Sequence, residues 1–142
     1  MSWQPEVDEL VRRRALAARM GGAEGVARQH SQGKLTVRER IDAFADAGSF
    51  RQFLGLMGRA TYEDGALADF TPRAAVDGIC TLDGRKVVVT GGDFTVRGGS
   101  GGSGGGMGME PPANRRALEW RVPYVRLLDA AGGSVRTFEE TG

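Results

Sequence analysis

The chain has 142 residues, of which 40% are hydrophobic and 26% charged, as expected for one soluble globular domain. A formal net charge of +1 gives no general attraction to nucleic acid or to anionic lipid, so neither partner is expected. No apolar run approaches the ~20 residues of a membrane span, and no apolar region like that of a signal peptide follows residues 1–5. The cytoplasm is therefore the expected compartment.

Two helices are predicted in the first third of the chain. Pro5 suits a first helical position, and an apolar stripe continues to about residue 19, formed by Val7, Leu10, Val11, Ala15 and Ala18. A polar stretch without a predicted element follows, and its lone His30 is expected to be exposed. Thr36 and Glu39 then form a capping box that starts a second helix. Residues 58–73 show no clear period and predict a loop.

The clearest prediction is a hairpin over residues 75–90. Two β-rich segments flank Asp83-Gly84, a pair that favours a type I′ turn. The run Val87–Val89 is apolar on both faces and indicates an interior strand, which residues 94–96 are expected to extend. Cys80 lies in the first of the two segments and is expected to be a buried, inert thiol.

A βαβ unit is predicted at the end of the chain. A helix begins at Pro111-Pro112 and continues to about Arg121, with Ala117, Leu118 and Trp120 partly buried, and a strand covers residues 124–128. Because the preceding strand, this helix and the last strand follow one another, the two strands are expected to be parallel. Their carboxyl ends then meet at one edge, where open α/β sheets bind ligands.

Glycine pairs follow both of these strands. The chain has 23 glycines, and residues 98–108 have the composition of a flexible linker. Gly98-Gly99 and Gly132-Gly133 allow bare backbone to approach a ligand and offer N–H donors to an enolate or thioester oxyanion. A tight turn is the alternative explanation of each pair.

Other chemistries find little support in the residues. One histidine and one cysteine do not supply the usual metal-ligand sets, so no metal is expected. His30 is the only base for a nucleophilic triad, and no nucleophile elbow is present. The Gly33-Lys34 pair lacks the first glycine and the Ser or Thr of a phosphate-binding loop.

The order of the motifs resembles one known family. Residues 30–41, beginning His30-Ser31-Gln32-Gly33-Lys34, and then residues 46–50, Asp46-Ala47-Gly48-Ser49-Phe50, are similar to the start of carboxyltransferase β subunits of biotin-dependent acyl-CoA carboxylases of the acetyl- and propionyl-CoA type. The segments at 77–78, 83–85 and 93–100, and the glycine pair at 132–133, continue in that family's order. The glycine-rich segment 20–25 also resembles the family.

This resemblance implies a fold and an activity. The fold is α/β, the N-terminal half of a crotonase-like carboxyltransferase, and incomplete. The implied domains are an N-terminal helical segment, 1–57, and the start of an acyl-CoA-binding domain, 58–142, with its Gly/Ser-rich loop at 98–108. The activity is transfer of a carboxyl group from carboxybiotin to an acyl-CoA, a step of fatty acid metabolism. The oxyanion donors are the N–H groups of Gly132 and Gly133, with Gly98 and Gly99 as further candidates.

The resemblance also implies partners. Biotin is carried on a biotin carboxyl carrier protein, a biotin carboxylase subunit loads it, and the full-length subunit forms a homo-oligomer. Members of the family run to several hundred residues, with a second crotonase-like half that this sequence lacks, so independent activity of the chain is not expected. The alternative is a truncated, non-catalytic module that binds CoA esters or another subunit.

Overall fold

The computed structural model describes residues 2–100 and 112–131, which form four α-helices, six strands and one 3₁₀ turn. The helices are α1 (Gln4–Ala18), α2 (Gly22–Ser31), α3 (Val37–Phe44) and α4 (Pro112–Trp120), with η1 (Arg97–Gly99). The strands are β1 (Arg51–Phe53), β2 (Gly58–Glu63), β3 (Ala66–Pro72), β4 (Ala75–Leu82), β5 (Arg85–Gly92) and β6 (Tyr124–Leu127). No helix in these ranges is long and apolar enough to cross a membrane.

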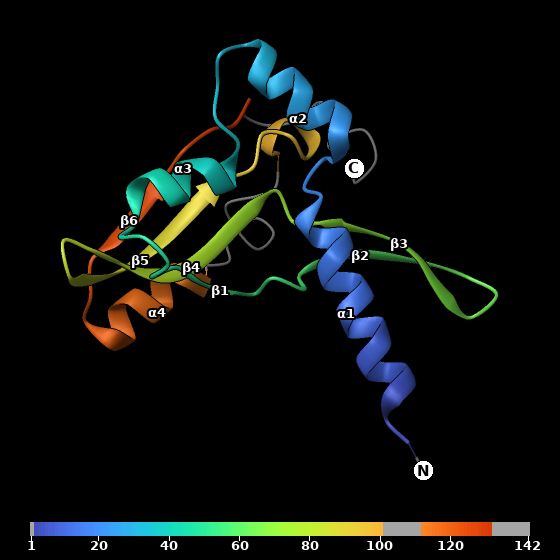
Figure 1. The fold of residues 1–142 in the computed structure, drawn as a ribbon. Helices are drawn as coiled ribbons and strands as arrows, with labels where there is room; N and C mark the ends of the chain where they lie inside the picture. The colour runs from blue at the N-terminus through green and yellow to red at the C-terminus, as the bar shows by residue number, and fades with distance from the viewer. Residues whose placement is uncertain (1, 101–111, 132–142) are drawn as a thin grey trace, which may run out of the picture.

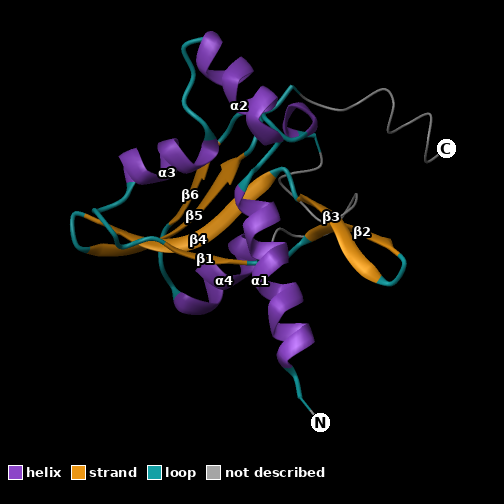
Figure 2. Ribbon diagram, turned by 45° about the vertical axis from the view of Figure 1, so that its right-hand side comes forward, coloured by secondary structure: helices purple, strands orange, loops and turns teal. Residues whose placement is uncertain are grey.

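A four-stranded sheet in the order β1-β4-β5-β6 carries the fold, with α3 on one face and α4 on the other (Figures 1 and 2). Val87 and Val89 point toward α3, where Cys80 and Phe44 complete the cluster. Val88 points the other way and packs on the buried Ala113 and Ala117 of α4. The interior strand and the buried cysteine are therefore confirmed, because β5 lies between two neighbours and both of its faces are covered.

The predicted hairpin and the predicted βαβ unit are both present. Asp83 and Gly84 have φ values of 49° and 77°, as a type I′ turn requires, and β4 pairs antiparallel with β5. Strand β6 pairs parallel with β5, with Val88 opposite Tyr124. The Asp46 carboxylate, at the end of α3, accepts hydrogen bonds from the Asp83 and Gly84 amides at 3.0 and 2.9 Å.

Two predictions about local structure are wrong. Residues 58–73 form the β2–β3 hairpin, not a loop, and a bulge between Thr61 and Tyr62 explains the missing period. Residues 94–96 do not extend the sheet, because β5 ends at Gly92 and the chain turns into η1. The polar stretch after residue 20, for which no element is predicted, forms α2, whose Gln29 side chain is buried and hydrogen-bonded to the Leu35 carbonyl oxygen.

Two helices bury less of their apolar surface than the sequence indicates. On α1, which runs beside β3 (Figure 1), Ala17 is buried, whereas Val7 and Val11 of the predicted stripe are 48% and 59% exposed. On α4, Leu118 is 67% exposed because the small Ala113 and Ala117 make the contact with β5. Trp120 is also exposed, although its ring edge meets Phe53. The division of the chain after residue 57 stays a prediction.

Candidate functional site

The chain leaves β5 through a turn that Asp93 organises. Asp93 is buried, and its carboxylate accepts hydrogen bonds from the Thr95 amide at 3.0 Å and the Thr95 hydroxyl at 2.5 Å. Burial raises the pKa of the Asp93 carboxyl, and the Thr95 hydrogen bonds act in the opposite direction. These contacts reverse the chain and direct it into η1, which carries the first glycine pair.

Gly98 and Gly99 both have left-handed backbone angles, with φ values of 62° and 76°. The Gly99 amide donates to the Val96 carbonyl oxygen at 2.9 Å, so its N–H is used inside the turn. The Gly98 amide has no acceptor among the described residues. Of the first pair, Gly98 is therefore the residue whose N–H is available to a ligand.

The first glycine pair lies directly against the chain that leads to the second. The Ala131 amide donates to the Gly98 carbonyl oxygen at 2.9 Å. A Cβ atom at Gly99 would lie 2.7 Å from the Asp129 carbonyl oxygen, closer than such atoms approach, so only glycine allows this contact. Gly132 and Gly133 lie outside the described residues. The structure thus brings the first junction next to the residues that immediately precede the second.

Asp129 holds this region against α2 and α3. Its carboxylate accepts a hydrogen bond from the side-chain amide of Gln29 at 2.8 Å. The same carboxylate lies 3.5 Å from the Lys34 ammonium and 3.9 Å from the Arg40 guanidinium. Arg40 also donates to the Leu127 carbonyl oxygen at 3.1 Å and to that of Gly92. One arginine and one aspartate therefore fix the carboxyl ends of β5 and β6 together.

The glycine-rich segment between α1 and α2 supports the turn from outside. The Gly21 amide donates to the Thr95 hydroxyl at 2.9 Å, and a Cβ atom at Gly21 would lie 1.9 Å from the Thr95 carbonyl oxygen. A Cβ atom at Gly25 would lie 3.2 Å from the same oxygen, which is a looser contact. The resemblance of residues 20–25 to the family thus has a packing explanation: bare backbone is needed where α2 meets the turn.

A buried polar network lies under the site, across β4, β5 and β6. Asp77 is 2% exposed, forms an ion pair with Arg73 and accepts from the Thr90 hydroxyl at 2.6 Å. The Tyr124 hydroxyl donates to the Thr90 hydroxyl oxygen at 3.0 Å. Burial lowers the pKa of the Arg73 guanidinium, but the adjacent carboxylate neutralises its charge.

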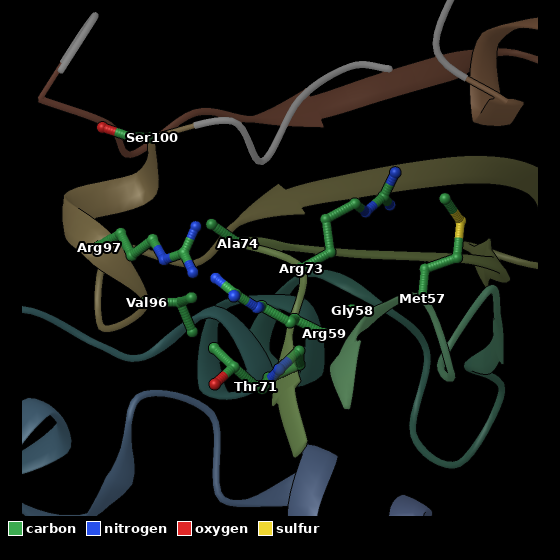
Figure 3. A pocket seen from close by; sticks show the side chains of 10 residues that line it. Met57, Gly58, Arg59, Thr71, Arg73, Ala74, Val96, Arg97 and Ser100 are labelled. Atoms are coloured by element: carbon green, nitrogen blue, oxygen red, sulfur yellow. The ribbon is translucent and has the colours of Figure 1, made fainter. Parts of the chain in front are cut away.

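A cavity of about 330 Å³ opens beside η1, between the turn and the β2–β3 hairpin (Figure 3). Arg59, Arg73 and Arg97 line it, together with Val96 and Ser100 on the η1 side. Since Arg97 immediately precedes Gly98, the cavity adjoins the first glycine pair.

The remaining chemically distinctive residues have structural contacts. His30 is exposed, as predicted, and its ring Nε2 lies 2.9 Å from the Glu39 carboxylate. That contact and the Thr36 amide and hydroxyl lower the pKa of Glu39 to about 2. Burial raises the pKa of the Cys80 thiol. Among residues 2–100 and 112–131, no group of three His, Cys, Asp or Glu side chains could hold a metal ion.

Sequence reasoning missed Arg40, Asp129 and Asp77. Asp129 carried a usable signal, because a carboxylate directly after a predicted parallel strand lies at the ligand edge of the sheet. Arg40 carried no such signal, because its partner Asp129 is 89 residues away in the sequence. Asp77 carried none either, because its ion pair with Arg73 is buried in the fold.

Comparisons with known proteins agree with this architecture. Residues 28–141 match the family model described as the carboxyl transferase domain. The chain is 36% identical to the propionyl-CoA carboxylase carboxyltransferase subunit of Haloferax mediterranei, over 96% of the chain and 26% of that protein. It is 31% identical to the methylmalonyl-CoA carboxyltransferase 12S subunit of Propionibacterium freudenreichii, over 92% of the chain and 25% of that subunit.

A solved structure of transcarboxylase 12S, with hydrolysed methylmalonyl-coenzyme A bound, has a TM-score of 0.74 and 30% identity, covering 95% of this chain and 27% of the other. This likeness confirms the α/β, crotonase-like fold that the resemblance implied. The chain spans about a quarter of the length of these relatives. It belongs to the carboxyl transferase domain family.

Proposed function

We propose that this chain is the acyl-CoA side of the carboxyltransferase component of a biotin-dependent acyl-CoA carboxylase. The component transfers a carboxyl group from carboxybiotin to the α-carbon of an acyl-CoA. The observation that carries the proposal is the contact of Gly98-Gly99 with residues 129–131, which precede Gly132-Gly133. In this proposal, Gly98-Gly99 and Gly132-Gly133, which directly follow residues 129–131 in the sequence, supply main-chain donors to one oxygen atom.

The chemistry follows from where negative charge develops. When the proton leaves the α-carbon of the thioester, the electron pair delocalises onto the thioester oxygen and an enolate forms. Backbone N–H groups stabilise that oxygen, and removing one such donor costs about 2.7–4 kcal/mol of transition-state stabilisation. The enolate carbon then bonds to the carboxyl carbon, whose bond to the biotin nitrogen breaks, and that nitrogen takes up the proton that left the α-carbon. We assign the donors to Gly132, Gly133 and Gly98, with Gly99 weaker because its N–H already donates to Val96.

The proposal includes the partners of the reaction. Biotin reaches the site on a biotin carboxyl carrier protein, a biotin carboxylase subunit loads it, and the full-length subunit works as a homo-oligomer in cytoplasmic fatty acid metabolism. Support comes from the relatives, whose names describe them as subunits of carboxylases and carboxyltransferases. For transcarboxylase 12S, the solved structure is described as a hexamer.

One contact favours a second candidate, a non-catalytic module that binds CoA esters or a partner subunit. The Gly99 N–H closes the η1 turn, so a site that took both of its donors from the first pair would lack one of them. Such a module binds acyl-CoA without stabilising an enolate.

Two measurements separate these candidates. Calorimetric titration of the chain with propionyl-CoA measures binding, and consumption of methylmalonyl-CoA by the full-length subunit in the presence of free biotin measures carboxyl transfer. Binding with transfer supports the transferase, binding without transfer supports the module, and absence of binding at millimolar ligand contradicts both.

A backbone ester tests the donor directly. Replacing the Gly98 amide with an ester, by incorporating glycolic acid in a semisynthetic chain, removes the N–H and leaves the side chains unchanged. In the full-length subunit that contains this segment, we expect a hundredfold or greater loss of transfer. The matched ester at Gly99 removes an N–H that serves the turn, so it is expected to lower stability more than transfer. An equal loss of transfer from both esters would contradict the assignment of Gly98.

A further inference from the structure

Positive charge lines the cavity between η1 and the β2–β3 hairpin, and no acid balances it among the lining residues that the structure describes. Its volume is about 330 Å³, and the described residues that line it include Arg59, Arg73 and Arg97 but no aspartate or glutamate. Elsewhere around the end of β5, the Arg40 guanidinium and the Lys34 ammonium both lie near the Asp129 carboxylate. The described lining of the cavity has no such carboxylate, so its charge suits an anionic ligand.

The three arginines are not equivalent. Arg73 is largely buried and forms an ion pair with Asp77, and its guanidinium group turns away from the other two (Figure 3). The guanidinium groups of Arg59 and Arg97 point toward one another from opposite sides of the cavity (Figure 3). Neither forms an ion pair with any residue in the described ranges. Within the part of the chain that the structure describes, these two positive charges of the cavity have no carboxylate partner.

The backbone fixes the two arginines where they converge. Arg59 lies on β2 in register with Thr71 of β3, inside a paired strand. Arg97 has a left-handed φ of 50°, a conformation that is unfavourable for a residue with a side chain. The η1 turn maintains it through the Ser100 amide, which donates to the Arg97 carbonyl oxygen at 3.2 Å. The charge of Arg97 is thus held near that of Arg59, an arrangement that an anion bound between the two would stabilise.

We propose that Arg59 and Arg97 bind a phosphate group in this cavity. The planar guanidinium fork matches the geometry of phosphate oxygens, and two such groups match the charge of about −1.5 to −2 on a phosphate monoester. The phosphate comes either from free inorganic phosphate or from the nucleotide end of a CoA thioester. The second source rests on the proposed function, whereas the first does not.

The first experiment needs no CoA. The full chain is titrated with inorganic phosphate at low ionic strength and followed by calorimetry. We expect saturable binding that weakens roughly tenfold in Arg59→Gln and in Arg97→Gln, because each loses a charge-assisted contact. Arg85→Gln, at the far β4–β5 turn, is the matched control and is expected to bind phosphate like the unchanged chain. Malonate in place of phosphate tests for a general preference for anions.

A second pair of variants guards against misfolding. Arg59→Lys and Arg97→Lys keep the charge and remove the fork, so we expect phosphate affinity between that of the unchanged chain and that of the glutamine variants. Circular dichroism melting of every variant tests whether the fold persists. Glutamine variants that bind phosphate like the unchanged chain, malonate bound as tightly as phosphate, or an equal loss in Arg85→Gln would each overturn the proposal.

CoA and pantetheine identify the source of the phosphate. If the nucleotide end occupies the cavity, the double variant Arg59→Gln/Arg97→Gln weakens CoA binding about a hundredfold and leaves the binding of pantetheine, which has no phosphate, unchanged. If inorganic phosphate binding falls while CoA binding does not, the cavity binds free phosphate. If the unchanged chain binds inorganic phosphate but does not bind CoA, the proposed function is contradicted and the proposed phosphate site is not.

Discussion

Around the carboxyl end of β5, positive charge is balanced differently on two sides of the molecule, the side of α2 and α3 and the side of the β2–β3 hairpin. On the α2–α3 side, Arg40 and Lys34 both approach the Asp129 carboxylate. On the hairpin side, Arg59 and Arg97 line a cavity whose described lining holds no acid. Charge that is neutralised inside the protein holds strands together, whereas charge left without a partner is available to a ligand. The two sides should therefore respond differently to substitution.

The largest effect is expected where the balanced charge is most buried. Asp77→Asn leaves the Arg73 guanidinium without its carboxylate between β3 and β4, and removing one partner of a buried ion pair costs about 3–5 kcal/mol. Urea unfolding measures the loss in the free energy of unfolding. Asp69→Asn is the matched control, since Asp69 pairs with Arg19 at an exposed site. A similar small loss in both variants would contradict the structural role of the buried pair.

Arg40 tests the α2–α3 side itself. Arg40→Met keeps the aliphatic length but removes the donors to the Gly92 and Leu127 carbonyl oxygens and the charge beside Asp129. We expect a loss of about 1.5–3 kcal/mol, because hydrogen bonds to a charged group contribute that much. Hydrogen exchange should also quicken at the Gly99 and Ala131 amides, which donate within this region. Arg28→Met, on the exposed face of α2, serves as control, and unchanged exchange in Arg40→Met contradicts its anchoring role.

The contact of α2 with the β5 turn can be tested through two glycines. Gly21→Ala places a Cβ atom 1.9 Å from the Thr95 carbonyl oxygen, and relieving such an overlap typically costs about 1–3 kcal/mol. Gly25→Ala approaches the same oxygen at 3.2 Å and should lose less. Thermal melting of the two variants compares them directly. If Gly25→Ala is the more destabilised, α2 does not sit on the turn as described.

The elements that the sequence could predict are those specified by residues close together in the chain. The β4–β5 hairpin, α3 and the βαβ unit follow from local signals: Asp83-Gly84, the Thr36 capping box, and an apolar strand followed by a helix. The β2–β3 hairpin carried a similar signal in Asp64-Gly65, with φ values of 49° and 80°, but its bulge interrupts the alternation on which strand prediction depends.

The charged contacts of the site were not predictable in this way. Arg40 meets Asp129 only after the sheet forms, and α2 is placed by Gln29, which donates to a carboxylate 100 residues away. Arg40 follows Glu39 on α3 and Arg59 follows Gly58 on β2, and neither local sequence indicates whether the arginine has an acidic partner. What separates a structural arginine from a ligand-binding one is the presence of an acid across the fold, and only the tertiary structure supplies that information.

The smallest effect on stability is expected on the hairpin side. Arg97→Gly removes both an unfavourable φ of 50° and a charge that faces Arg59, so we expect the free energy of unfolding to rise by up to about 1 kcal/mol. Arg97→Ala keeps the unfavourable backbone angle and removes the charged side chain beyond Cβ, so the difference between the two variants isolates the backbone contribution. Both should lose phosphate affinity, in contrast to Arg40→Met, which should lose stability instead. A destabilised Arg97→Gly would mean that Arg97 holds the fold together as Arg40 does, and the distinction between the two sides would fail.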